Sequence, residues 1–359
     1  MPIVDHVPLG PMTSLRVGGA ARRFVEVRDE ASLVGEILAA DERAEPVLVL
    51  GGGSNLVVAD EGFDGLVVRV ASRGVQVTAE GRRVRLDVAA GEPWDALVER
   101  CVGEGWSGVE CLSGIPGLAG ATPIQNVGAY GQEVKETIRR VRVLDRRMRT
   151  VRTIEASECG FAYRASAFKG NDCFVVTAVS FELDVRGESA PLRYAELTRA
   201  LGVSDGERAP LAPVRETIVA LRRAKGMVLD PGDPDSVSAG SFFVNPVLDG
   251  LALAALEARL DARGIERRTL PRFPGGGDGR TKVSAAWLIE RAGFTKGWGE
   301  GRVGISRKHS LALVNRGGAT ARELLALARS IQLGVEEAFG VALSPEPVVA
   351  PSVGVPFGG

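Results

Sequence analysis

The run Leu50-Gly51-Gly52-Gly53-Ser54-Asn55-Leu56 decides how this chain folds. It joins two short apolar stretches, residues 46–50 and 56–60, which are typical of buried strands. Glycine allows positive φ angles and lets a ligand approach the main chain closely, and consecutive backbone N–H groups form a nest for anionic oxygens. The run therefore predicts a diphosphate-binding turn. It fits neither a Walker loop nor a Rossmann fingerprint, and a glycine-rich hairpin remains the alternative.

A second glycine-rich run, residues 113–131, reads SGIPGLAGATPIQNVGAYG and is nearly free of charge. Its five glycines and two prolines exclude one long strand. A long uncharged loop inside a globular chain usually binds a ligand, because loops carry function on a rigid scaffold. Its backbone N–H groups can hydrogen-bond a polar cofactor, as can the side chains of Ser113, Thr122, Gln125 and Asn126.

The composition describes a globular protein and excludes several classes of partner. The chain has 359 residues, 45% of them hydrophobic, which is enough for two or three domains. A formal net charge of -1 gives no electrostatic reason to expect nucleic acid or an anionic membrane as a partner. The sequence has no segment of transmembrane length and no secretory signal, so a cytoplasmic protein is expected. Its four cysteines lack metal-ligand spacing, so no metal site is expected.

The periodicity predicts an α+β chain of alternating elements. Strands are expected at residues 24–27, 46–50, 56–60, 65–70, 75–77, 84–88, 140–144, 174–181 and 311–315. Helices are expected at residues 31–40, 94–105, 214–225, 252–263 and 320–339, the last capped by Thr320. Three domains are expected, at residues 1–70, 71–218 and 219–352, followed by a flexible tail at 353–359.

Three further segments bring chemically useful side chains together. The segment 161–169 places Arg164 beside aromatic residues, where its planar fork could clamp a carboxylate; a surface strand with a cation–π pair is the alternative. Ser241, in the segment 238–246, has no histidine nearby in the sequence to make it a nucleophile, so it could act as a proton donor or a structural cap. Glu346 lies between two prolines and could equally be a solvated carboxylate.

Together and in this order, the segments resemble one family, the UDP-N-acetylenolpyruvoylglucosamine reductases. These flavoenzymes complete UDP-N-acetylmuramate in bacterial cell-wall synthesis. The resemblance rests on LGGGSNL at residues 50–56, PIQNVGAYGQE at 123–133, YRASAFK at 163–169 and GSFFVNP at 240–246. Each motif is moderately specific, whereas their joint order, spread over residues 12 to 350, is highly specific.

The resemblance implies a fold and a cofactor. The fold is a two-subdomain FAD-binding fold of the vanillyl-alcohol-oxidase/PCMH type with a C-terminal α+β substrate-binding domain, and FAD is bound non-covalently. The implied cofactor-binding residues lie mostly on the two glycine-rich runs: Gly51, Gly52, Gly53, Ser54, Asn55, Ser113, Gly114, Ile115, Pro116, Gly117, Thr122, Ile124, Gln125, Asn126, Gly128, Ala129, Tyr130, Gly131 and Arg222.

The resemblance also implies a two-stage reaction. NADPH reduces FAD and leaves, and flavin N5 then transfers a hydride to C3 of the enolpyruvyl group of UDP-N-acetylglucosamine enolpyruvate. Arg164 matches the arginine that polarises the substrate carboxylate, Ser241 matches the proton donor to C2, and Glu346 matches a glutamate near the same carboxylate. Positioned cations and donors of this kind stabilise charge that develops in the transition state.

The implied substrate-binding residues are Tyr163, Tyr194, Lys225, Asn245 and His309. The loop around Tyr194 resembles that of the type I members, and a monomer is expected. The sequence departs from the family at Val244 and Val348, where basic residues are usual. Two other functions remain open: a sugar or alcohol oxidase of the same superfamily, and a catalytically inactive flavin or nucleotide-sugar binding protein.

Overall fold

The structure is a computed structural model that describes residues 2–277 and 279–351. The chain forms two compact units, each assembled from segments that are distant in sequence. The first unit contains the N-terminal strand up to Val7 and residues 21–53 and 64–228. The second contains residues 8–20, 54–63 and the chain from Leu229 onward. The three domains expected from the sequence remain a prediction, and the expected tail at 353–359 lies outside the described residues.

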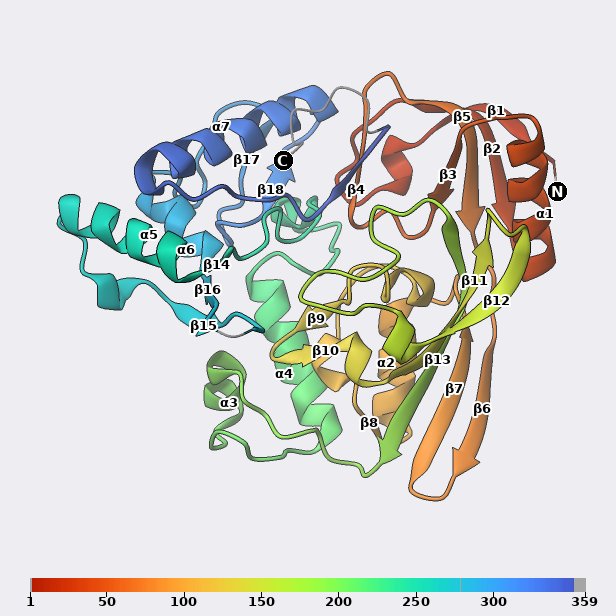
Figure 1. Ribbon diagram of the computed structural model, residues 1–359, viewed down its shortest axis with the longest axis horizontal. Helices are drawn as coiled ribbons and strands as arrows, with labels where there is room; N and C mark the ends of the chain where they lie inside the picture. Colours follow the sequence, from red (N-terminus) through yellow and green to blue (C-terminus); the bar gives the residue numbers. More distant parts are fainter. Residues whose placement is uncertain (1, 278, 352–359) are drawn as a thin grey trace. The chain divides into compact units, whose positions relative to one another are not determined.

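A four-stranded sheet begins the first unit (Figure 1). Its strands are β1 (Val4–Pro8), β2 (Ala20–Val27), β5 (Phe63–Val70) and β3 (Val47–Leu50), in that order, and β3 runs parallel to β5. Helix α1 (Glu30–Glu42) begins at Asp29, whose side chain accepts a hydrogen bond from the backbone N–H of Ser32. Buried aliphatic side chains from α1 and the sheet form one core, so the apolar face of this helix covers one face of the sheet.

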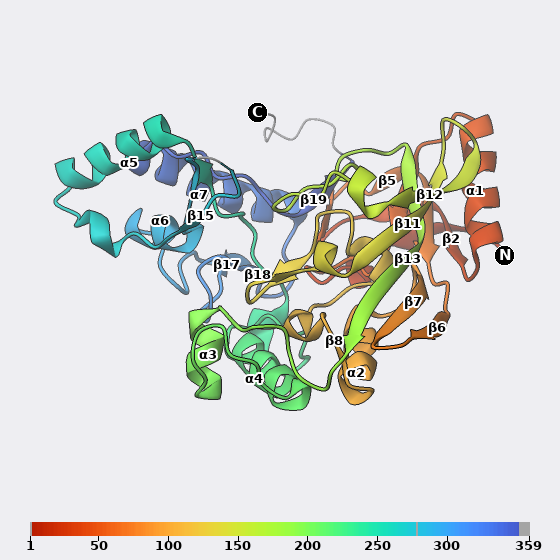
Figure 2. The same ribbon diagram turned by 60° about the horizontal axis from the view of Figure 1, so that its bottom comes forward.

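A six-stranded antiparallel sheet forms the rest of the core of this unit. It contains β12 (Thr150–Glu155), β11 (Ile138–Asp145), β13 (Phe174–Val185), β7 (Arg83–Ala89), β6 (Val75–Glu80) and β8 (Trp106–Ser107). Helix α2 (Trp94–Gly103) lies beside β8 (Figure 2). Trp94 packs against Phe181 with ring centroids 5.7 Å apart. Residues 75–77 and 84–88, both expected to be strands, pair with each other as parts of β6 and β7.

The remaining elements of the first unit surround the loop at 113–131. Helices α3 (Ala195–Leu201) and α4 (Leu211–Ala224) pack together over a small apolar core. Strands β9 (Gly128–Ala129) and β10 (Gln132–Glu133) form a hairpin. Short 3-10 turns connect the elements of this unit at Glu110–Leu112, Ala119–Ala121, Val134–Glu136 and Ala156–Glu158.

The second unit packs three helices around short strands. Helix α7 (Ala321–Phe339) contacts both α5 (Gly250–Ala262) and α6 (Ala285–Arg291). The strands pair as β14 (Val247–Leu248) with β16 (Thr281–Val283) and β15 (Arg272–Pro274), β17 (Val303–Ile305) with β18 (Leu313–Asn315), and β4 (Leu56–Val58) with β19 (Val348–Ala350). Short 3-10 turns lie at Gly10–Met12, Pro234–Ser236 and Arg267–Thr269.

The structure confirms the helix predicted at residues 320–339, which is α7 (Ala321–Phe339). Thr320 and Glu323 form a reciprocal capping box at its start, and Gly340 ends it with a φ of 68°. Within residues 2–277 and 279–351, every helix is too short or too polar to cross a membrane.

Candidate active site

The predicted diphosphate-binding turn follows β3 in the first unit. Gly53 has a φ of 63°, in the left-handed region that favours glycine. A Cβ atom added at Gly52 would lie 2.8 Å from the Cα of Gly117, closer than real Cβ atoms approach. The turn and the loop at 113–131 therefore meet backbone to backbone, and the two glycine-rich runs identified in the sequence are neighbours in space.

Three polar side chains of the loop at 113–131 brace the loop itself. Ser113 and Thr122 each donate a hydroxyl hydrogen bond to the carbonyl three residues earlier, at 2.6 and 2.8 Å. Asn126 donates from Nδ2 to Oε2 of Glu133 and to the carbonyl of Ala162, both at 2.9 Å. Since these bonds fix the loop's path, its backbone N–H groups gain a defined direction.

The other predicted cofactor residues divide between the two units. Tyr130 and Gly131 form the hairpin turn between β9 and β10, with φ angles of 49° and 84°. Ser54 and Asn55 belong to the second unit. The rest lie in the first unit on the two glycine-rich runs: Gly51, Ile115, Pro116, Ile124, Gln125, Gly128 and Ala129.

Arg164 lies in a tight turn, which excludes the alternative of a surface strand at this position. Ala162 and Ala165 pair across the turn, and Arg164 has a φ of 53°, which is uncommon outside glycine. Its Nη2 donates to the carbonyl of Gly128 at 2.7 Å, and its guanidinium lies 5.4 Å from the ring centroid of Tyr163. The cation–π pair of that alternative is therefore present, but in a turn, and the guanidinium is hydrogen-bonded to the hairpin of the cofactor loop.

The backbone N–H and the backbone carbonyl of Gly114 both form hydrogen bonds with side chains. Its N–H donates to Oδ1 of Asp95 at 2.6 Å, and its carbonyl accepts from Nε of the buried Arg222 at 3.2 Å. Arg222 also donates from Nη2 to the carbonyl of Met227 at 2.9 Å, and burial lowers the pKa of its guanidinium. Arg215 binds both oxygens of Asp95, at 2.6 and 3.0 Å. The start of the loop is thus fixed to α2 and α4.

Replacing Asp95 with asparagine is expected to lower the free energy of unfolding by about 1 kcal/mol at neutral pH, since the carboxylate is partly exposed and water screens its ion pair. Burial alone would raise the pKa of Asp95, but hydrogen bonds from Arg215 and Gly114 outweigh this effect and lower it. The stabilisation is therefore present above the unfolded-state pKa, about 3.9, and is lost as the pH falls through the folded-state pKa.

Urea unfolding of the two proteins at a series of pH values measures this difference. The difference in unfolding free energy between the wild type and Asp95→Asn is expected to be largest near pH 7. It is expected to shrink toward about pH 3, below the ordinary pKa of an aspartate. A gap that stays constant over this range would rule out ionisation of Asp95 as its cause.

Tyr194 and Lys225, two predicted substrate residues, lie together in the first unit. The ring of Tyr194 meets that of Tyr130 edge to face, with centroids 5.3 Å apart, and Nζ of Lys225 lies 5.8 Å from the ring centroid of Tyr130. Lys225 also forms an ion pair with Glu196 at 2.5 Å. Burial raises the pKa of Tyr130 to about 12 and raises that of Tyr194, so both phenols stay protonated at neutral pH.

Ser241, His309 and Glu346 come together in the second unit. The residue after Ser241, Phe242, donates its N–H to the carbonyl of Leu311 at 2.7 Å and accepts at its carbonyl from the N–H of Glu346 at 2.9 Å. Ser241 Oγ lies 3.5 Å from Nε2 of His309. A histidine 68 residues away in the sequence thus contacts the predicted proton donor, which the local sequence around Ser241 did not indicate.

Two asparagines fix the segments around these side chains. Asn245 accepts at Oδ1 from the N–H of Ala285 at 2.9 Å, at the start of α6. Asn55 donates from Nδ2 to the carbonyl of Glu346 at 3.1 Å, and its own carbonyl accepts from the N–H of Val348 at 3.0 Å. Val348, where the family usually has a basic residue, therefore serves in the pairing of β19 with β4.

Sequence reasoning did not single out several side chains that hold these residues in place. Asp95 and Glu196 carry no local signal, because each is one acidic residue on an ordinary helix. Nor does the sequence predict a role for the run at 230–236, although its buried Asp235 binds Arg307 at 3.0 Å.

Two family models match the chain. Residues 21–153 match the FAD binding domain, and residues 233–350 match the C-terminal domain of UDP-N-acetylenolpyruvoylglucosamine reductase. Among curated proteins, the UDP-N-acetylenolpyruvoylglucosamine reductase of Thermobifida fusca is 55% identical over 345 residues, which cover 96% of this chain and 97% of that protein. The enzyme of the same name from Streptomyces avermitilis is 52% identical and covers 96% of this chain and 94% of that protein.

A solved structure is also similar. The crystal structure of UDP-N-acetylenolpyruvylglucosamine reductase from Thermus caldophilus matches with a TM-score of 0.66 and 27% identity, over 98% of this chain and 100% of that one. The predicted fold class, an FAD-binding fold followed by a C-terminal α+β domain, is confirmed by these matches. The chain therefore belongs to the UDP-N-acetylenolpyruvoylglucosamine reductase family of oxidoreductases and contains its FAD binding domain.

Proposed function

We propose that this chain is an NADPH-dependent flavoenzyme that reduces UDP-N-acetylglucosamine enolpyruvate to UDP-N-acetylmuramate, a precursor of peptidoglycan. Relatives of that name at 52–55% identity over 96% of the chain support the reaction. The proposal depends on one observation. The segment of Ser241 pairs with the segment of Glu346, because the carbonyl of Phe242 accepts a hydrogen bond from the N–H of Glu346. One hydroxyl donor and one carboxyl group on adjacent segments suit an enolpyruvyl substrate, which needs a proton on one carbon and contacts at its carboxylate.

The first unit fits FAD. Gly52 has no Cβ because one would collide with Gly117, and the glycine-rich backbone of this turn offers N–H groups to a diphosphate. The adjoining uncharged loop suits the flavin ring, and Arg222 holds the start of that loop through Gly114. Binding is non-covalent in this proposal, since neither histidine of the sequence occurs in an attachment motif. When bound and reduced, FAD supplies a hydride to C3 of the enolpyruvyl group.

The chain's own residues then stabilise charge and move a proton. Arg164 binds the substrate carboxylate, because its guanidinium is already oriented by the carbonyl of Gly128. Glu346 contacts the same carboxylate as a hydrogen-bonding carboxyl group. Ser241 donates its Oγ proton to C2, where negative charge develops during the reaction.

In this proposal the substrate is also bound by Tyr163, Tyr194, Lys225, Asn245 and His309. Lys225 binds a phosphate of the UDP group, and Tyr194 covers it. Lys225 pairs with Glu196 at 2.5 Å, so the diphosphate competes with that carboxylate for the ammonium group. The two protonated phenols add no negative charge near this ion pair.

The proposed setting is the bacterial cytoplasm, where the enzyme acts as a monomer in the supply of cell-wall precursors for growth and division. NADPH is the reductant, and the proposal includes neither a metal ion nor a nucleic-acid or membrane partner. The balanced charge of the sequence supports this setting.

One absorbance experiment tests the proposal. The purified protein, reconstituted with FAD and kept free of oxygen, is expected to lose its yellow colour when NADPH is added and to regain it when the enolpyruvyl substrate is added. Bleaching by a sugar without NADPH, followed by return of the colour when oxygen is admitted, would indicate an oxidase instead. Binding of FAD or substrate without any colour change would indicate an inactive binding protein.

A further inference from the structure

His309, which contacts Ser241, lies in a turn at residues 306–309 that several hydrogen bonds stabilise. Ser306 is fully buried, and its Oγ accepts hydrogen bonds from the backbone N–H groups of Lys308 at 3.0 Å and His309 at 3.3 Å. The next residues also anchor this turn, because the carbonyl of Leu311 accepts the N–H of Phe242. The backbone of His309 is therefore fixed relative to the backbone of Ser241.

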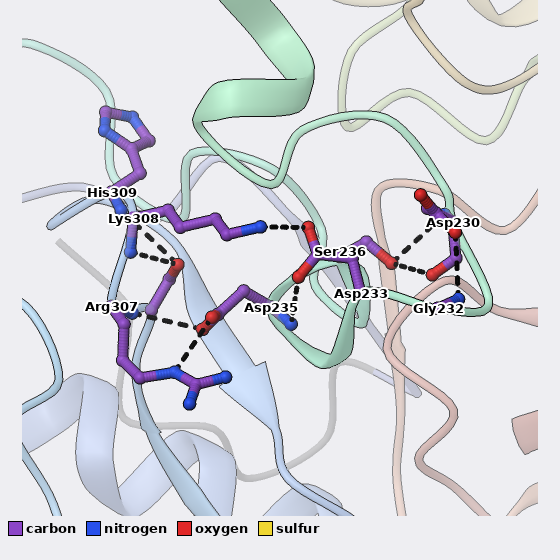
Figure 3. A network of polar contacts seen from close by, with 9 residues as sticks. Asp230, Gly232, Asp233, Asp235, Ser236, Arg307, Lys308 and His309 are labelled. Atoms are coloured by element: carbon purple, nitrogen blue, oxygen red, sulfur yellow. Dashed lines mark hydrogen bonds and ion pairs between the residues drawn. The ribbon is translucent and has the colours of Figure 1, made fainter.

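The acidic loop at 230–236 clamps the same turn (Figure 3). Asp235 is 3% exposed and accepts from both the backbone N–H and Nε of Arg307, at 3.1 and 3.0 Å. Asp233 accepts from Nζ of Lys308 at 2.7 Å. Figure 3 shows the imidazole of His309 pointing away from Asp233 and Asp235. These two carboxylates bind Lys308 and Arg307, the two residues that follow Ser306.

We propose that His309 is a positioning residue for Ser241 and supplies the proton that Ser241 must recover. The inference rests on the proposed function. The Oγ–H bond of Ser241 breaks as its proton moves to C2, and the electron pair of that bond stays on Oγ. The Nε2–H bond of protonated His309 then breaks, and its proton forms a new Oγ–H bond. The neutral imidazole takes a proton from water before the next turnover.

The chemistry of a serine donor explains why such a partner is useful. A hydroxyl is a weak acid, so its alkoxide forms readily only where a charged donor stabilises it. Protonated imidazole is such a donor and, unlike lysine or arginine, exchanges its proton near neutral pH. While Nε2–H donates to a lone pair of Oγ, the hydroxyl proton of Ser241 remains available to the substrate.

Several charged groups lie on the elements next to His309. They include Asp233, Asp235, Arg307 and Lys308 on the clamp, and Glu346 on the segment that pairs with Phe242 and Phe243. The two aspartates each face one of the two cations. Glu346 is the carboxyl group of this set that lies on a different element from the clamp.

Substitution of His309 by glutamine tests the inference in the holoenzyme. Glutamine keeps a donor near Ser241 but has no proton to release. Anaerobic protein is reduced with NADPH and then mixed with saturating substrate at a series of pH values. The recolouring rate of the wild type is expected to fall as the pH rises through the titration midpoint of His309. His309→Gln is expected to recolour about 10- to 100-fold more slowly and to lose this pH dependence, with bleaching by NADPH unchanged.

A second measurement does not depend on activity. The chain has two histidines, so the imidazole NMR signals of His309 are identified by comparison with His6→Gln. Ser241→Ala is expected to shift the titration midpoint of His309 and to leave that of His6 unchanged. His6→Gln is also the matched kinetic control, because it makes the same chemical change at an exposed position of β1.

The outcomes separate this inference from the proposed function. Recolouring of His309→Gln at the wild-type rate with the wild-type pH profile would overturn the inference, as would a His309 titration that is unaffected by Ser241→Ala. Failure of NADPH to bleach the wild-type protein would instead contradict the proposed function, and the NMR titration would still decide whether His309 and Ser241 are coupled.

Discussion

Replacing Ser241 with alanine is expected to leave bleaching of the flavin by NADPH unchanged and to slow recolouring by the enolpyruvyl substrate by about 1,000-fold. The asymmetry follows from the chemistry, because NADPH oxidation needs no proton from the protein, whereas reduction of the enolpyruvyl group requires one at C2. Alanine removes the hydroxyl and keeps the Cβ, so the backbone pairing of Phe242 with Leu311 and Glu346 is retained. Stopped-flow absorbance of the flavin, one half-reaction at a time, measures both rates.

Two further variants make the result specific to the proton. Ser241→Cys keeps a donor of similar size and is expected to recolour at a rate between those of the wild type and the alanine variant. Ser330→Ala removes an exposed hydroxyl of α7 and is expected to change neither rate. Recolouring of Ser241→Ala at the wild-type rate would exclude Ser241 as the donor. An equal loss in both half-reactions would show instead that the substitution disturbs the flavin.

The elements that could be predicted are those with a signal inside one continuous segment. Helix α7 combines a capping box at Thr320, an apolar face and a terminal Gly340. Strands β7 and β6 alternate and lie close in the sequence, so their pairing follows. Helices α3 and α6 have only 7 residues each, too few to show a helical period.

The partners in the candidate site could not be predicted, because they meet only through tertiary structure. Asn55 and Glu346 are 291 residues apart, and their contact depends on the parallel pairing of β4 with β19. Apolar residues predict the strand at 56–60, which the structure confirms as β4, but β19 has 3 residues, too few for a reliable alternating pattern. Motif resemblance identified Ser241 and His309 separately, whereas the turn that joins them depends on Ser306, whose role is visible only in the folded chain.

Replacing Gly52 with alanine is expected to destabilise the first unit by about 1–3 kcal/mol, the range for overpacking, and to remove most of the bound flavin. The new Cβ would lie 2.8 Å from the Cα of Gly117, and a backbone atom cannot rotate away as a side chain can. The turn and the loop at 113–131 must therefore move apart, which changes the direction of the N–H groups proposed to hold the diphosphate. Urea unfolding of the apoprotein and the flavin content after reconstitution measure the two effects.

Gly51→Ala is the matched control for the packing term. A Cβ at Gly51 would meet Cδ1 of Leu118 at 3.7 Å, an ordinary van der Waals contact, so the apoprotein is expected to keep its free energy of unfolding within about 0.5 kcal/mol. Equal stability and equal flavin content in the two variants would mean that the approach of Gly52 to Gly117 is not required. If Gly52→Ala loses flavin while the apoprotein keeps its free energy of unfolding, Gly52 acts mainly in binding the ligand. If both the flavin content and the free energy of unfolding fall, Gly52 acts mainly in the contact between the turn and the loop at 113–131.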